Sequence, residues 1–286
     1  MSLCLCFSLA RFSLGVIGKP YRSYVALGDS LSEGLGDFTF HQSREYNGWT
    51  DRLAGALARE ARDLGHDFHF ANLAIRGAKL EKIVSTQLPL ALRLQPDLVT
   101  LMAGSNNLLG KDQNLPALKA LLTDAVQTLL AAGCDVVLAN TINPMHLRVF
   151  APLRKRAHRF SLMIEEVAGE LEVPVLDIFG IEDFEALVYW AEDMVHFSGH
   201  GHIKVANRAA RLLDLRYRYP EPDPIELTPV SRGLVETVRW VGRDVVPFFQ
   251  RRIKGVTAGD GLDPKHLELK VYNPDYRHPK WELISA

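Results

Sequence analysis

The sequence predicts an α/β protein, built as a three-layer α/β/α sandwich around a five-stranded parallel sheet. Two observations carry this prediction. Short apolar runs alternate with longer segments of helical periodicity through residues 24–217, a pattern typical of right-handed crossover connections between parallel strands. Glycine and polar residues follow directly after several apolar runs, as at the carboxyl edge of an open α/β sheet. A flavodoxin-like strand order, 2-1-3-4-5, is the arrangement we expect.

The individual elements follow from the period of the apolar residues. The apolar, β-prone runs predict strands at 24–27, 68–73, 97–102, 134–139 and 173–178. Apolar spacing of three and four predicts helices at 49–64, 80–94, 116–132, 154–171, 182–190 and 199–217. Pro89 lies inside the second of these helices, where we expect a kink, because proline has no N–H to donate.

Composition excludes several classes of protein. The 286 residues include 33 basic and 34 acidic side chains, for a net charge of −1, so the chain has no electrostatic footprint for nucleic acid. The chain has three cysteines, Cys4, Cys6 and Cys134. This small, odd number does not fit a disulfide framework. No cysteine–histidine spacing resembles a zinc site, and we expect neither a metal nor an organic cofactor.

The chain divides into three parts by composition. Residues 1–22 are expected to form a disordered or loosely packed leader, residues 23–217 the catalytic domain, and residues 218–286 an extension. The extension follows a proline-rich connector and contains an amphipathic pattern at 234–253, interrupted by Pro247. We expect this helix to pack on the parent domain; a second subunit and a membrane surface are the alternatives. The sequence leaves the oligomeric state open.

The leader raises the question of location. Its apolar run is interrupted by Arg11, lacks a basic start and has no clear cleavage site. We therefore expect a cytoplasmic protein, with secretion as the alternative.

The stretch that organises the chain is 25–34, where an apolar run stops abruptly at Gly28-Asp29-Ser30. A serine at this strand-to-helix turn is exposed and free to react, although serine is also a favoured helix cap. Far downstream, Asp193 and His196 lie three residues apart in a predicted loop. An aspartate bonded to the imidazole Nδ1 would leave Nε2 able to take a proton from the serine.

Four short sequence blocks resemble, in their order along the chain, those of the SGNH hydrolases, also called GDSL-type esterases and lipases. The resemblance spans about residues 24–217. The blocks are Gly28-Asp29-Ser30-Leu31, Gly77, Gly104-Ser105-Asn106-Asn107 and Asp193-Met194-Val195-His196.

The resemblance implies the SGNH hydrolase fold and a role for each residue. Ser30 would be the nucleophile, His196 the base and Asp193 its orienting acid. The backbone N–H groups of Ser30 and Gly77 and the side chain of Asn106 would form the oxyanion hole. Taken singly, Gly77 is also compatible with a simple turn glycine and Asn106 with a helix cap.

The implied activity is hydrolysis of a carboxylic ester through an acyl-enzyme. Short-chain esters, lysophospholipids, acyl thioesters and O-acetylated saccharides are candidate substrates. The alternatives are an acyltransferase that uses the same triad and a non-catalytic saccharide- or lipid-binding protein on the same fold.

Other polar residues near these blocks are expected to have structural roles. Asn107 stands where the family often has aspartate, which puts the support of that turn in question but not the oxyanion donor. We expect Asp29 to fix the turn before Ser30, and His200 and His202 to be surface or packing histidines. Asp177 is an alternative triad acid, but it comes early in the chain.

Overall fold

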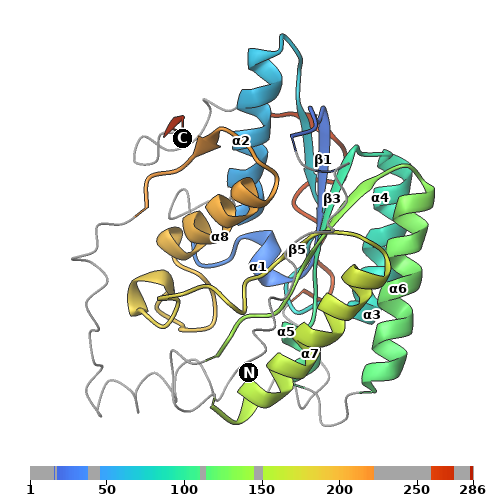
Figure 1. Ribbon diagram of the computed structural model, residues 1–286, viewed down its shortest axis with the longest axis vertical. Helices are drawn as coiled ribbons and strands as arrows, with labels where there is room; N and C mark the ends of the chain where they lie inside the picture. The colour runs from blue at the N-terminus through green and yellow to red at the C-terminus, as the bar shows by residue number, and fades with distance from the viewer. Residues whose placement is uncertain are drawn as a thin grey trace, which may run out of the picture.

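A mostly parallel sheet runs through the centre of the computed structural model (Figure 1). The structure describes residue 16 and residues 18–37, 46–109, 114–144, 151–221, 259–273 and 284–285. Five strands run parallel: β1 (Ser23–Leu27), β2 (His69–Asn72), β3 (Leu98–Met102), β4 (Asp135–Ala139) and β5 (Val175–Leu176). Their order, β5-β4-β3-β1-β2, confirms the flavodoxin-like prediction.

Helices cover both faces of the sheet (Figure 1). One layer holds α1 (Ser30–Glu33), α2 (Trp49–Asp63) and α8 (Gly199–Leu212). The other layer holds α3 (Leu80–Lys82), α4 (Leu88–Leu94), α6 (Leu115–Ala131) and α7 (Ala151–Glu170). The short helix α5 (Ser105–Leu108) follows β3. These layers confirm the predicted three-layer architecture.

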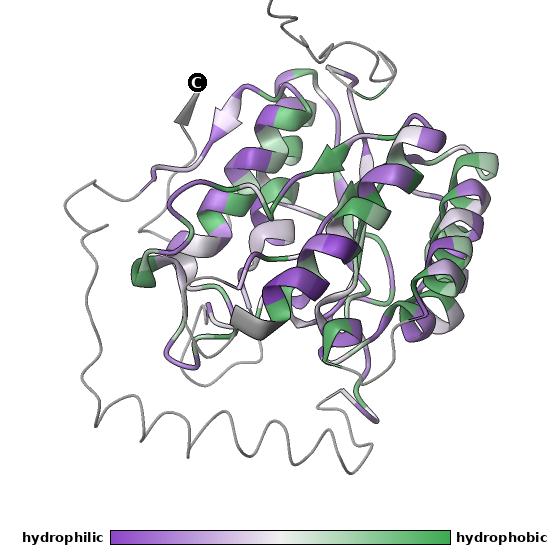
Figure 2. Cartoon of the chain, turned by 60° about the horizontal axis from the view of Figure 1, so that its bottom comes forward, coloured by the Kyte–Doolittle hydropathy of each residue, from purple (hydrophilic) through white to green (hydrophobic). Residues whose placement is uncertain are grey.

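Strand β1 shows why the apolar runs are continuous. Tyr24 and Ala26 belong to the core beneath α2 and α8, whereas Val25 and Leu27 belong to the core beneath α4 and α6. Because both faces of a parallel sheet are buried, its strands need apolar side chains at every position and show no alternation. The long helices, in contrast, carry both hydrophilic and hydrophobic residues (Figure 2).

Proline reshapes the helix predicted at 80–94. The segment begins as α3, widens into the π-helical turn η1 (Ile83–Gln87) and continues as α4. The Leu88 N–H donates to the carbonyl of Ile83, five residues earlier. Pro89, in the first turn of α4, has no N–H for the carbonyl of Ser85, so the regular pattern cannot continue through it. The expected kink is therefore a π-helical turn.

Two other elements are shorter than predicted. The segment 182–190 is mostly turn, with only the 3₁₀ turn η3 (Leu187–Tyr189), and β5 covers two of the six residues expected. Asn140 accounts for the early end of β5, because its Oδ1 accepts the N–H groups of Ile178 and Phe179 at 2.6 and 2.9 Å. These N–H groups thus bond to a side chain instead of continuing the strand ladder.

The described end of the expected leader packs on the domain. Val16 and Tyr21 are buried, and the Tyr21 hydroxyl donates to the Val16 carbonyl at 2.9 Å. The Gly18 N–H donates to the carbonyl of Leu213, just after α8. This part of the leader is not loosely packed, because its apolar side chains complete the core beneath α8.

The C-terminal extension adds a strand that the sequence did not predict. β7 (Lys270–Val271) pairs antiparallel with the outer edge of β2, which makes a sheet of six strands among the described residues. A second pairing joins β6 (Tyr217–Arg218) to β8 (Ile284–Ser285). The amphipathic helix expected at 234–253 lies outside the described residues. Within the described part of the chain, no helix is long and apolar enough to span a membrane.

A buried ion pair anchors the segment before β7. The Nζ of Lys265 lies 2.7 Å from Oδ1 of Asp51 on α2, and these side chains are 10% and 1% exposed. The same ammonium group donates to the carbonyl of Tyr46. Nearby, the His266 N–H donates to the carbonyl of Asn72 at 3.1 Å, so the segment is bonded to both α2 and the end of β2.

We expect Lys265→Met to lower the free energy of unfolding by about 3 kcal/mol, because it leaves the Asp51 carboxylate buried without its partner. Urea denaturation of the full chain measures this loss. Lys119→Met is the matched control, since Lys119 pairs with Glu166 and Glu170 on the surface and should change stability little. Equal losses in the two variants would contradict the anchoring role of Lys265.

Candidate active site

Ser30 occupies the turn between β1 and α1. The strand ends at Leu27, and Ser30 is the half-buried first residue of the helix. Asp29 is the N-cap residue, and its Oδ1 accepts the N–H of Leu31 at 3.0 Å. The alternative that Ser30 merely caps the helix is wrong, because Asp29 has that role. The Ser30 hydroxyl is thus not needed to hold the turn.

Gly28 fits this turn only because it lacks a side chain. An added Cβ would lie 2.5 Å from the Ser32 Oγ and 2.9 Å from the Met102 carbonyl oxygen. The Gly28 N–H donates to Oε1 of Gln87 at 2.8 Å, and Nε2 of Gln87 donates back to the Gly28 carbonyl at 2.9 Å. The Gln87 side chain thereby gives the backbone of Gly28 a partner after β1 has ended.

Gln87 is a site residue that the sequence reasoning missed. It is 1% exposed and lies four residues after Ile83, which is also buried. A glutamine at a core-facing position of an apolar helix was the available signal, because a buried amide needs hydrogen-bond partners. Its partners, however, lie 59 residues away in the chain, so they could not be read from local sequence.

Asp193 and His196 form a hydrogen-bonded pair within one loop. Oδ2 of Asp193 lies 2.6 Å from Nδ1 of His196. Oδ1 accepts the backbone N–H groups of Val195 and His196, each at 3.0 Å. Burial raises the pKa of Asp193, but the bonds from His196 and the two backbone N–H groups outweigh it and lower the pKa to about 2. The acid is therefore ionised at neutral pH and orients the imidazole.

The loop that carries His196 packs against the chain just after α1. Nε2 of His202 lies 3.0 Å from the Leu35 carbonyl oxygen. Gly36 lies so close to this loop that an added Cβ would come within 2.0 Å of the Phe197 carbonyl oxygen. His196 is also near enough to Asp29 for its charge to lower the pKa of that carboxyl. The loop that carries the imidazole is thus held close to the end of α1.

His202 has a structural role in this docking. Its Nδ1 accepts the Trp49 N–H at 3.1 Å, so Nε2 carries the hydrogen and donates to Leu35. Burial, together with the nearby Arg52 charge, lowers the pKa of His202 to about 4, and the ring is neutral at pH 7. The described residues contain no group of three histidine, cysteine or acidic side chains placed to hold a metal ion.

Gly77 and Asn106 follow the strands on either side of β1. Gly77 has φ +76° in the turn after β2, and the nearby Ile75 N–H donates to the Gly28 carbonyl at 3.2 Å. Asn106 lies in α5 after β3, and its Nδ2 donates to Oδ2 of Asp29 at 2.9 Å. The bond to Asp29 orients an amide group that is suited to donate to an oxyanion.

Asp29 is a buried carboxyl between these elements. It is 1% exposed. Burial raises its pKa from 3.8 to about 6, although the Leu31 N–H, the His196 charge and the Asn106 amide all oppose the increase. Asp29 therefore changes its protonation state near pH 6, directly beside Ser30.

Asn107 and Arg76 hold the Gly77 turn. Oδ1 of Asn107 accepts the Leu80 N–H at the start of α3, and its Nδ2 donates to Glu81 at 2.9 Å. An aspartate at this position could not donate that second bond. The Arg76 N–H donates to Oε2 of Glu33 at 2.7 Å, and the two side chains also form an ion pair. The turn is therefore tied to α1 and α5.

Asp177 is occupied elsewhere. Its Oδ1 accepts from the Asn140 side chain at 2.8 Å and from the Gly180 N–H at 2.9 Å. Its Oδ2 pairs with Arg208 at 3.2 Å. Of the two acids considered for the triad, Asp193 is the one that the structure places on His196.

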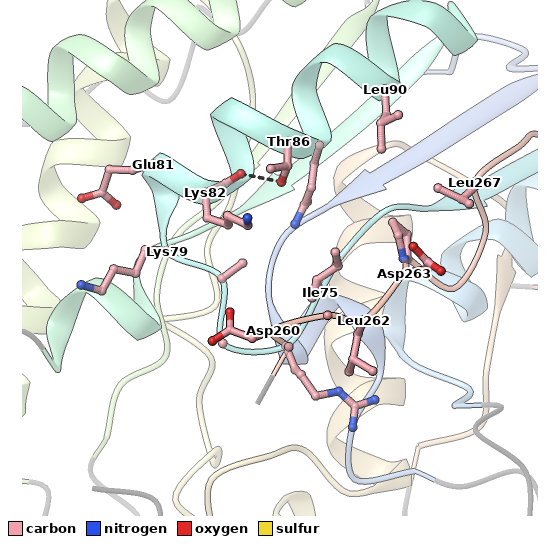
Figure 3. Close-up of a pocket in the computed structure, with 17 residues that line it drawn as sticks. Ile75, Lys79, Glu81, Lys82, Thr86, Leu90, Asp260, Leu262, Asp263 and Leu267 are labelled. Atoms are coloured by element: carbon pink, nitrogen blue, oxygen red, sulfur yellow. Dashed lines mark hydrogen bonds between the residues drawn. The ribbon is translucent and has the colours of Figure 1, made fainter. Parts of the chain in front are cut away.

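A cavity of about 650 Å³ adjoins the Gly77 turn (Figure 3). One wall comes from residues 75–90, which include Gly77 and Gln87. Residues 259–267 of the C-terminal extension form the opposite wall. The cavity therefore exists only because the extension folds back over this end of the sheet.

Comparison with known proteins agrees with the geometry. The model of the family described as GDSL-like Lipase/Acylhydrolase matches residues 26–203. No curated protein sequence matches the chain.

Three solved structures have a similar fold, and the match covers most of the length of each. Axe2, an acetylxylan esterase from Geobacillus stearothermophilus, is 18% identical with a TM-score of 0.55, over 67% of this chain and 94% of that one. LAE5, an α/β hydrolase from the metagenome of Lake Arreo in Spain, is 17% identical with a TM-score of 0.57, over 70% and 96%. The lipase Lip_vut3 from a goat rumen metagenome is 19% identical with a TM-score of 0.52, over 66% and 96%.

The raised pKa of Asp29 predicts how stability depends on pH. The folded state holds the proton more tightly than the unfolded state, so the stabilisation is complete below pH 3.8 and is lost as the pH rises to about 6. Over this interval the free energy of unfolding should fall by roughly 3 kcal/mol. Urea denaturation between pH 4 and 7 should show a shallower loss in Asp29→Asn than in the wild type. Parallel profiles would contradict the raised pKa. The lowered pKa of Asp193 acts below pH 3.8, outside this interval.

Proposed function

Because the chain belongs to the GDSL-like lipase and acylhydrolase family, we propose that it is a serine hydrolase that cleaves carboxylic esters through an acyl-enzyme. The observation that carries the proposal is the 2.6 Å bond between Asp193 and His196, on a loop packed against the chain just after α1, the helix that begins at Ser30. An ionised acid, an oriented imidazole and a serine at a strand end are the groups that acyl transfer requires.

In the first half of the reaction, Ser30 Oγ attacks the carbonyl carbon of the ester while His196 Nε2 takes the hydroxyl proton. Asp193 stays ionised and stabilises the imidazolium. The N–H groups of Ser30 and Gly77 and the amide of Asn106 donate to the oxyanion. The C–O bond to the alcohol then breaks, His196 returns its proton to the leaving oxygen, and the acyl group is left on Ser30.

In the second half, water replaces the alcohol. His196 takes a proton from the water as it attacks the acyl carbon, and the same donors stabilise the second oxyanion. Collapse of this intermediate breaks the bond to Ser30 Oγ, which regains the proton from His196. The products are one carboxylic acid and one alcohol for each ester and water consumed, and the residues of the site return to their starting state.

The substrate panel follows from the fold comparison. Axe2 is named as an acetylxylan esterase, so O-acetylated saccharides belong beside p-nitrophenyl esters of graded acyl length. Each substrate is tested for hydrolysis by the full chain.

The nucleophile is tested with a fluorophosphonate probe. We expect the wild type to be labelled at Ser30, and Ser30→Ala to lose both labelling and nearly all hydrolysis of p-nitrophenyl acetate. The melting temperature should change little, because Asp29 rather than Ser30 caps α1. Labelling or turnover that persists in a folded Ser30→Ala protein would show that another residue is the nucleophile.

The oxyanion donors are tested by comparing neighbouring amides. Asn106→Ala should lower kcat by about 100-fold or more with little change in KM, because the lost bond strengthens in the transition state. Asn107→Ala is the control: it removes an amide whose bonds go to Leu80 and Glu81 and should reduce kcat much less. Equal losses of kcat in the two variants would show that the oxyanion donor has been assigned to the wrong residue.

A further inference from the structure

We propose that the cavity beside the Gly77 turn binds the acyl chain of an uncharged aliphatic ester, and that Leu262 of the C-terminal extension limits the length of that chain. This inference rests on the function proposed above. It assigns a role in substrate selection to the extension, none of whose described residues is among the reacting groups proposed above.

The position of the cavity connects it to the reacting carbonyl. Gly77, whose N–H is the candidate oxyanion donor, lines the cavity. So does Gln87, whose amide bonds the backbone of Gly28, two residues before Ser30. A carbonyl oxygen held by the Gly77 N–H therefore brings the carbonyl carbon to the mouth of this cavity, where one of its two substituents can enter.

The direction of proton transfer decides which substituent enters. His196 must protonate the leaving alkoxide, so the alcohol lies on the side of the site that faces His196. Among the described residues, the loop of 187–198 contributes nothing to the lining of the cavity. The acyl chain is then the substituent that points away from His196 and toward the Gly77 turn.

The lining suits a neutral aliphatic chain. The positive charges of Arg76, Lys79 and Lys82 are matched by an equal number of negative charges, so the lining offers no net charge to an anionic or cationic ligand. Five of these six charged residues are exposed, and the sixth, Arg76, is already paired with Glu33. The apolar lining residues are Ile75, Ala78, Leu90, Leu262, Pro264 and Leu267.

The volume of the cavity allows a chain longer than acetyl. At about 650 Å³ it falls within the range of about 300–1,000 Å³ that is common for small-molecule sites. Figure 3 shows Thr86 and Leu90 on the helical wall, with Leu262 and Asp263 on the wall formed by the extension. Leu262 is half-buried and is thus able to contact a bound chain.

The wall formed by the extension is held in place. Gly259 lies so close to the Gly77 turn that an added Cβ would come within 2.2 Å of the Arg76 carbonyl oxygen. The Leu262 N–H donates to the Gly259 carbonyl at 3.1 Å. Three residues after Leu262, Lys265 forms its buried ion pair with Asp51. Leu262 therefore lies between two fixed points.

Two substrate series test the proposal with the full-length protein. The first keeps p-nitrophenol as the alcohol and lengthens the acyl chain from acetyl to dodecanoyl. The second keeps the acetyl group and lengthens an alkyl alcohol. Leu262→Trp fills the cavity and should lower kcat/KM for octanoyl relative to acetyl esters by about tenfold or more, while Leu262→Ala should move the preference to longer acyl chains. Neither variant should change the ranking within the alcohol series.

Leu64→Trp is the matched control, because Leu64 is an exposed leucine at the end of α2 and does not line the cavity. Melting temperatures verify that each variant is folded. A change in the alcohol series alone would overturn the acyl assignment, and unchanged preferences in both series would show that the cavity is not a substrate site. Failure of the proposed function is distinguishable from failure of the acyl-chain proposal. In the former case the wild type itself would resist the fluorophosphonate probe and would hydrolyse neither series.

Discussion

The candidate site depends on how the chain leaves the sheet at Gly28. Strand β1 ends one residue earlier, and Ser32 and the Met102 carbonyl leave no room for a Cβ at this position. The backbone polar groups of Gly28 lie in the interior, where an unpaired donor or acceptor is costly. Gln87 bonds both of them, and Asp29 caps the helix that begins at the next residue. With these needs met by other groups, the Ser30 hydroxyl is not required to hold the turn.

Much of this arrangement could be predicted, because the strand order determines which strand ends lie next to one another. β2 and β3 flank β1, so the residues that follow them, Gly77 and Asn106, come to the same edge as Ser30. The pairing of Asp193 with His196 was predictable for a different reason: the two residues lie three apart in one loop. Both inferences use information that a single sequence contains.

The features that the sequence did not predict depend on contacts between distant segments. Gln87 meets Gly28 only after α3 and the π-helical turn fold over the sheet, and local periodicity predicts a regular helix there. β7 is two residues long and has no alternation to identify it. The bond between Lys265 and Asp51 spans 214 residues. For each of these, the partner is chosen by tertiary packing rather than by neighbouring residues.

The turn at Asp193 also bears on how such a site tolerates change. One carboxylate oxygen of Asp193 bonds two backbone N–H groups of its own loop, and the other bonds the ring of His196. These three bonds all lie within residues 193–196, so the carboxylate and the imidazole are held together by one short stretch of chain. A change in the surrounding loops that leaves residues 193–196 intact would therefore move both side chains together and keep the bond between them. In evolution, the position of the imidazole could therefore change while the carboxylate that orients it stays in place beside it.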